Sequence, residues 1–160
     1  MSQFVVVSGI SSSNSTGTNL NERTAPNRHV NNLTGTSFAP GTVLTSLETR
    51  NLIDGQPLTE ATWERIGTNR WVNRTLGTTH NMLRVTAGGT KGVTTRSTTI
   101  RTGPGTNFAS VRTLATGSGV VPVSTITTSG TPNLGGAGRW LRIASRQWVR
   151  GADVNQQTKA

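Results

Sequence analysis

The sequence predicts an all-β protein built from two tandem small β-barrels. Only 14% of the 160 residues are charged and 4% are aromatic, while glycine is frequent, and long amphipathic helices need more Leu, Ala, Glu and Lys than this chain contains. The second observation is a repeat: Trp63-x-Arg-Ile, four residues and Trp-Val recur at Trp140. All four tryptophans belong to this pattern, which indicates a duplication.

Further similarities extend the repeat toward the N-terminus. The matched segments are 23–26 with 101–104, 38–41 with 114–117, and Phe4–Gly9 with Leu83–Gly88. They predict a first barrel over residues 1–79, a second over 80–155 and a polar tail over 156–160. Each unit of under about 80 residues buries only a modest core, so we expect contact between the units to stabilise both.

In the first repeat, short β-branched or aromatic segments bounded by polar turns indicate strands. We expect strands or extended segments at 4–7, 20–23, 43–47, 63–66 and 71–74, with loops at 8–19 and 26–32 and an inserted loop at 52–61. Residues 58–63 form the one helix-like patch, and a strand is the favoured interpretation from Trp63 onward.

The second repeat follows the same course. We expect strands or extended segments at 83–85, 98–101, 111–114 and 120–126, loops at 87–92 and 127–138, a tight turn at 103–107, and a final hairpin of 140–143 with 147–150. Short strands without helices favour a small barrel that closes its own edges.

The second repeat contains four separated motifs, which are Ile100-Arg-Thr-Gly-Pro-Gly-Thr-Asn-Phe108, Leu114-Ala-Thr-Gly117, Gly138-Arg-Trp140-Leu-Arg-Ile143 and Gln147-Trp148-Val149. Together and in this order they resemble bacterial SH3-type (SH3b) domains. The first repeat keeps both tryptophans but has Asn27 where the family has glycine, and its loop at 51–60 is enlarged. The resemblance implies tandem SH3-like barrels that bind without catalysis, either docking in phage-type particles or attaching to peptidoglycan.

The candidate binding residues come from the Trp-x-Arg pattern and the Asn-Phe of the tight turn. Trp63 and Trp140 stand at strand starts, where an aromatic ring can line a groove, although burial in the core is an equal alternative. Arg65 and Arg142 lie on the same strand faces and would either bind a ligand or pair structurally. The full set of candidates is Trp63, Arg65, Trp140, Arg142, Asn107 and Phe108, and Trp71 and Trp148 are assigned to the core.

Charge is concentrated in the second repeat. Residues 1–79 hold six arginines against five acids, whereas residues 80–160 hold eight arginines and two lysines against Asp153 alone. Arginine suits fixed contacts with carboxylates and phosphates, so we expect an acidic partner. An acidic protein surface in an assembly is the first hypothesis, with several copies or a homo-oligomer compatible with it. Peptidoglycan is the alternative, and nucleic acid is the least favoured because few aromatics are available for base stacking. Scattered arginines that only solubilise the surface are the remaining interpretation.

The inventory of reactive side chains argues against an enzyme. The chain has no cysteine, and its two histidines, His29 and His80, fall in different repeats. No cluster with metal-ligand spacing is visible, so we expect no metal and no cofactor. Glu60 and Glu64 form a possible carboxylate pair for glycoside cleavage, but the second repeat has no counterpart of either.

The N-terminus reads neither as a secretory signal nor as a membrane anchor. It lacks a basic start, and its apolar run at 4–7 is short. We therefore expect synthesis without a signal peptide, no membrane insertion, and a location in a virion or at an extracellular or cell-wall surface.

Overall fold

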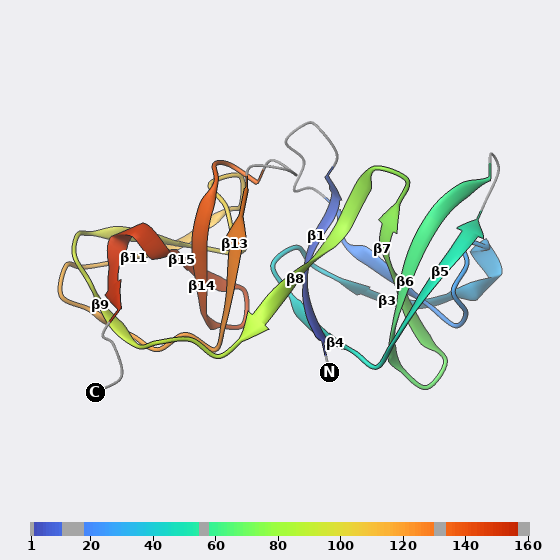
Figure 1. The fold of residues 1–160 in the computed structure, drawn as a ribbon, viewed down its shortest axis with the longest axis horizontal. Coiled ribbons are helices and arrows are strands. Elements are labelled where there is room, and N and C mark those ends of the chain that lie inside the picture. Colours follow the sequence, from blue (N-terminus) through green and yellow to red (C-terminus); the bar gives the residue numbers. More distant parts are fainter. Residues whose placement is uncertain (1, 11–17, 55–57, 130–133, 157–160) are drawn as a thin grey trace.

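The computed structural model describes residues 2–10, 18–54, 58–129 and 134–156, and these residues are all-β, as predicted (Figure 1). Within these ranges the chain forms sixteen strands, two short 3-10 helices at Val30–Asn32 and Gly151–Asp153, and no α-helix. Thirteen strands join in one sheet and three in another. Neither sheet closes on itself, so the structure differs here from the expected barrels that close their own edges.

The sixteen strands divide into two sets of eight. The first unit contains β1 (Ser2–Ile10), β2 (Leu20–Arg23), β3 (Leu33–Phe38), β4 (Val43–Ser46), β5 (Glu48–Asp54), β6 (Thr59–Gly67), β7 (Arg70–Leu76) and β8 (Thr79–Ala87). The second unit contains β9 (Gly92–Thr94), β10 (Thr98–Arg101), β11 (Ser110–Leu114), β12 (Gly119–Val120), β13 (Ser124–Thr128), β14 (Gly138–Ala144), β15 (Gln147–Arg150) and β16 (Val154–Gln156).

The strand pairings of the two units match. β1 pairs with β4 and β8, as β9 pairs with β12 and β16. β2 pairs with β3 and β7, as β10 pairs with β11 and β15. β5, β6 and β7 follow one another, as β13, β14 and β15 do. Each strand of the first unit therefore has a counterpart in the second.

The Trp-bearing hairpins also agree in register. Arg65 pairs with Trp71 and Arg142 with Trp148, and each hairpin shifts register before its turn. Asn69 and Arg146 occupy the matching turn position, and both have a φ of 52°, in the left-handed region. Two turns with the same strained residue at the same place are what a duplicated hairpin would retain.

Backbone hydrogen bonds identify β9, not β8, as the counterpart of β1. The Val6 N–H donates to the Thr42 carbonyl at 2.8 Å, and the Thr94 N–H donates to the Ser118 carbonyl at 2.9 Å. The match of Phe4–Gly9 with Leu83–Gly88 therefore reflects a shared strand pattern. β8 is the last strand of the first unit, and the units divide between Ala87 and Gly92 rather than at residue 80.

β8 also connects the two units physically. It pairs with β1 and β7 in the first unit, and its end pairs with β13 through Ala87 opposite Ser124 and Thr86 opposite Thr125. In Figure 1 this strand runs from one lobe of the molecule to the other. The units are thus joined by backbone hydrogen bonds as well as by the chain.

Buried apolar side chains form a core in each unit, a third cluster between the units, and a fourth, smaller cluster with Trp63 and Trp71 in the first unit. In β1, Phe4 and Val6 face the core of the first unit, with Val72 and Met82. The core of the second unit is formed by Ile100, Val120, Leu141, Val149 and Val154. We call the third cluster the junction core, and its members are Val5, Val7, Val85, Phe108, Ile126, Leu134, Trp140 and Trp148.

Four strand expectations need correction. The predicted inserted loop at 52–61 is largely strand, because β5 extends to Asp54 and β6 begins at Thr59. The predicted strand 120–126 is broken into β12 and β13 around Pro122, which has no N–H to donate to a ladder. The predicted loop 87–92 ends in β9. The expected loop at 8–19 begins as strand, because β1 extends to Ile10. Residues 11–17 of that loop and 157–160 of the tail lie outside the described residues.

Alanine substitutions at two matched glycines test the contact between the two units. Gly41 and Gly117 both have φ near 90°, but a Cβ on Gly41 would lie 1.7 Å from the Thr102 carbonyl oxygen, whereas Gly117 has open space. Alanine at Gly117 should cost about 1–2 kcal/mol of left-handed strain. Gly41→Ala should cost about 1–3 kcal/mol more, because the two units must separate locally. Urea denaturation of both variants measures the difference, and equal losses would contradict the described junction.

Candidate functional site

All four tryptophans are buried. Trp63 and Trp148 are fully covered, and Trp140 and Trp71 are 3% and 5% exposed. Trp140 and Trp148 lie in the junction core, whereas Trp63 and Trp71 pack with Ala61 in a small cluster of their own. No tryptophan therefore presents an open aromatic surface for a glycan or a nucleic-acid base.

The second unit uses the outer face of its Trp hairpin to bind the first unit. The Trp148 Nε1–H donates to the Gly41 carbonyl at 3.2 Å, and Arg146 Nε donates to the Pro40 carbonyl at 3.0 Å. Both acceptors belong to the turn before β4. This contact shows that the outer hairpin face of one unit can hold backbone carbonyls of a neighbour.

The edge of β13 completes this contact. The Gly88 N–H donates to the Val123 carbonyl at 2.8 Å, next to the pairing of β8 with β13. The counterpart of Val123 in the first unit is Leu47, because the N–H of each donates at 2.7 Å to the carbonyl of a matched arginine, Arg142 or Arg65. Within the described chain, β5 pairs only with β6. The edge of β5 that corresponds to the β8-covered edge of β13 therefore has no strand beside it.

Exposed apolar side chains lie along β5 and its turns. Leu47 is 46%, Leu52 37%, Ile53 60% and Leu58 71% exposed. Leu52 and Ile53 also line a surface hollow with Glu60 and Thr75. We call the outer side of β5, with Leu47, Leu52 and Ile53, the β5 edge. The sequence predicted an insertion here because this loop is longer than its counterpart in the repeat.

Arg65 and Arg142 both form structural pairs. Arg65 Nε lies 3.0 Å from Glu48 Oε2, and Arg142 Nε donates to Ser124 Oγ at 2.7 Å. Glu48 and Ser124 are matched positions, since each is paired with its arginine across the strands. Burial lowers the pKa of Arg142. Of the two interpretations of these arginines, the geometry supports pairing within the unit.

Asn107 and Phe108 contribute to the junction side of the second unit. Phe108 is 2% exposed, and its ring fills the space beside Gly103, where an added Cβ would lie 2.3 Å from the ring. The Asn107 N–H donates to the Leu134 carbonyl at 3.2 Å. The tight turn thus positions Phe108 in the junction core.

A buried carboxylate, Glu64, occupies the position of Leu141 in the first unit. Its oxygens accept hydrogen bonds from Ser46 Oγ at 2.9 Å and Thr49 Oγ1 at 2.7–2.8 Å, and Arg74 Nη1 lies 3.6 Å away. Glu60 is exposed and four residues away along β6, which places the two about 13 Å apart in an extended strand. That separation exceeds what paired glycosidase carboxylates use.

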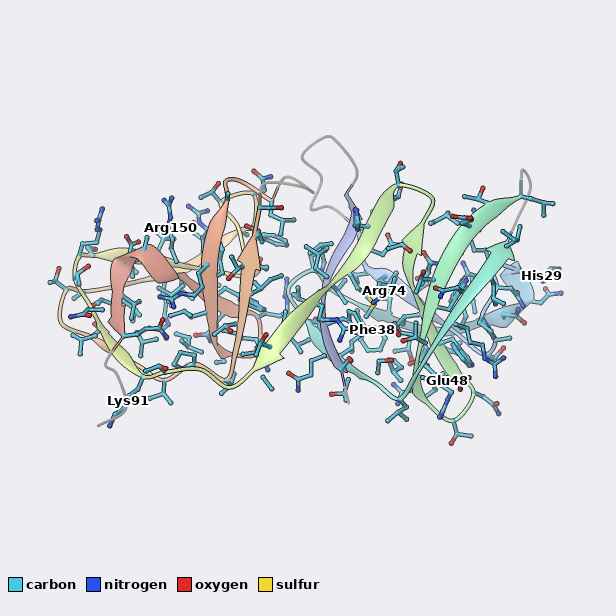
Figure 2. The ribbon with its side chains drawn as sticks, viewed as in Figure 1. His29, Phe38, Glu48, Arg74, Lys91 and Arg150 are labelled. Carbon is cyan, nitrogen blue, oxygen red and sulfur yellow. The ribbon has the colours of Figure 1, made fainter. Side chains whose placement is uncertain are left out.

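Basic side chains remain available on the second unit. Arg139, Arg150 and Lys91 are exposed and form no ion pair within the described residues, whereas Arg96 pairs with Asp153. Figure 2 shows Arg150 and Lys91 on the second unit, and places His29 at the opposite end of the molecule. In the described ranges, no group of three His, Asp or Glu side chains could hold a metal ion.

No family model matches the chain, and no curated protein matches its sequence. No helix in the described residues is long and apolar enough to cross a membrane.

Glu64 provides a test of buried polar pairing. Glu64→Gln keeps the shape but removes the charge that Ser46, Thr49 and Arg74 surround, so the free energy of unfolding should fall by about 1.5–3 kcal/mol. Glu60→Gln, at an exposed position of the same strand, should change it by less than about 0.5 kcal/mol. Chemical denaturation measures both, and an unchanged Glu64→Gln protein would show that the carboxylate is not held as described.

Glu48 provides a test of pH dependence. Hydrogen bonds from Arg50, and next from Arg65, lower the pKa of Glu48 below its ordinary value of 4.5. A group with a lowered folded-state pKa stabilises the protein above its unfolded pKa, and this contribution is lost as pH falls through the folded value. The Tm of wild type should therefore fall more steeply below pH 4.5 than the Tm of Glu48→Gln. Parallel Tm profiles would contradict this assignment.

Proposed function

We propose that this chain is a non-enzymatic docking protein made of two tandem SH3-like barrels, and that it is an accessory component of a virion-type or other extracellular assembly. The SH3-type motifs of the second repeat and the matched strand pairings of the two units support this proposal. The protein partner would add an extended segment to the β5 edge, in the way that sheet edges commonly recognise peptides.

The observation that carries the proposal is the contrast between two matched edges. On β13 the edge is covered by the end of β8, with Gly88 donating to Val123. On β5 the matched carbonyl belongs to Leu47, and exposed Leu52 and Ile53 follow it. The β13 edge of the second unit thus gives an internal example of a docked strand. The matching β5 edge of the first unit has no docked strand in the described chain.

The charge distribution favours an acidic partner surface. Lys91, Arg139 and Arg150 are exposed without an ion pair among the described residues, and they lie on the second unit. An acidic protein that pairs with β5 would gain faster association from this basic unit, although exposed charges add little to affinity.

Site-specific photo-crosslinking tests the function. A photoreactive phenylalanine analogue at Leu47 should give one saturable adduct with a protein of the assembly, and Ile53→Lys should reduce its yield because a charge disfavours edge pairing. The same analogue at Val123 should give no such adduct: its side chain is as exposed as that of Leu47, but its carbonyl already accepts from Gly88 and β8 occupies that edge. Val121→Lys, at another exposed valine, should leave the Leu47 adduct unchanged. No saturable adduct would overturn the proposal. Co-sedimentation with purified peptidoglycan that Ile53→Lys does not alter would instead support the cell-wall alternative.

A further inference from the structure

The hollow beside the β5 edge lies on the inner face of the first unit, and we call it the Glu60 hollow. Its volume is about 380 Å³. Directly opposed residues of an antiparallel pair share a face, so Ile53 lies beside Glu60 on it, and Asn51 lies beside Thr62. The Thr62 hydroxyl donates to Asn51 Oδ1 at 2.9 Å, in agreement with this register. Glu64, two residues after Thr62, points from the same face into the interior of the unit.

Glu60 supplies the charge of this hollow. Its side chain is exposed, and it is the one ionisable residue among the described residues that line the space. Its carboxylate forms no ion pair within the described chain. Arg74 lies 3.6 Å from the buried Glu64, and Arg50 pairs with Glu48 at 2.7 Å on the opposite face of the sheet. The hollow therefore presents a negative charge that these neighbouring arginines do not neutralise.

Apolar surface separates this carboxylate from the open edge of β5. Ile53 is 60% exposed, and β5 pairs only with β6 in the part of the chain that the structure describes. In a strand added at this edge, the residue opposite Ile53 would lie two strand spacings from Glu60, about 9.5 Å. A lysine or arginine can cross that distance with its apolar stem on Ile53 and its charged end at the carboxylate. An acidic residue at the same place would meet a like charge.

The matched place in the second unit has the opposite charge. Arg139 corresponds to Thr62, because each lies opposite the matched residue of β13 or β5. Two residues earlier in the chain, Ala137 stands where the first unit has Glu60. Residues 1–79 hold five of the six acids of the whole chain. The carboxylate at the open edge is thus a property of the first unit alone.

We propose that the Glu60 hollow receives a lysine or arginine side chain from the partner strand that pairs with β5, and that it thereby selects a basic residue at this point of the strand. The strand rests on the proposed docking function, whereas the cation follows from the hollow. The same partner would present its acidic surface to the second unit, where Lys91, Arg139 and Arg150 are exposed. Opposite charge preferences at the two units would fix the direction in which the partner lies.

The test follows the backbone ¹H–¹⁵N NMR signals of Asn51 and Ile53 while the full chain is titrated with acetyl-Thr-Val-Lys-Val-Thr-amide. These signals should shift saturably. The matched peptide with glutamine at the central position should bind about three- to fivefold more weakly, because a partly exposed ion pair contributes an effect of that size.

Variants of the full chain identify the carboxylate responsible. Glu60→Gln should remove the preference for the lysine peptide, and Glu60→Lys should reverse it in favour of a peptide with central glutamate. Glu60 is exposed, so both variants should fold, and their Tm values check this. Glu48→Gln removes a carboxylate from the opposite face of the same sheet and should leave the preference unchanged.

Three results would rule out the inference: no shift of the two signals up to about 10 mM peptide, equal affinity for the lysine and glutamine peptides, or a lysine preference that survives Glu60→Gln. Equal affinity for n-butylamine and the lysine peptide would also rule it out, since the cation would then bind without a strand. Equal peptide affinities with an intact Leu47 adduct would reject the cation and leave the docking function standing. A lysine preference that depends on Glu60, without any Leu47 adduct, would support the cation site and reject the docking function.

Discussion

Burial of β1 on both faces is the constraint on which the rest of the structure depends. Phe4 and Val6 pack into the first unit, while Val5 and Val7 pack against the second, and all four are fully buried. A strand buried on both sides requires a second layer of structure. The junction core supplies it, so each small unit gains apolar burial that its own eight strands do not provide. β8 adds backbone pairing to the same interface.

The two copies have diverged according to what each hairpin face meets. Ile126 pairs with Trp140 and lies in the junction core, whereas its counterpart Arg50 pairs with Trp63 and places its guanidinium 5.1 Å from the ring centroid of Trp71. On a face that contacts no neighbour, an arginine can cover an aromatic ring while its charged group stays in water. An isoleucine there would expose its own apolar surface to water. The same hairpin thus serves as an interface in one unit and as a solvated surface in the other.

Local signals in the sequence predicted the parts of the fold that local geometry determines. The two Trp hairpins and β2 with its counterpart β10 lie where the repeat placed them, because each repeats within a few residues. The division after Ala87 was not predictable from the pattern, since it depends on which distant strand β8 pairs with. The burial of Trp140 and Phe108 likewise depends on the junction core, which brings together residues from Val5 to Trp148. β5 was missed because Leu52 and Ile53 are exposed, so they give no buried-strand pattern.

The same divergence explains why the first unit holds the candidate sites. In the second unit, the neighbour fills the space in front of the hairpin, satisfies the Trp148 indole and covers the β13 edge. In the first unit, Trp63 Nε1 has no hydrogen-bond partner within the described residues, and the β5 edge carries exposed leucine and isoleucine side chains. Long edge strands with exposed apolar residues invite pairing with other chains, and a buried donor without an acceptor is costly. A partner strand paired along the β5 edge would cover these side chains, as β8 covers the β13 edge.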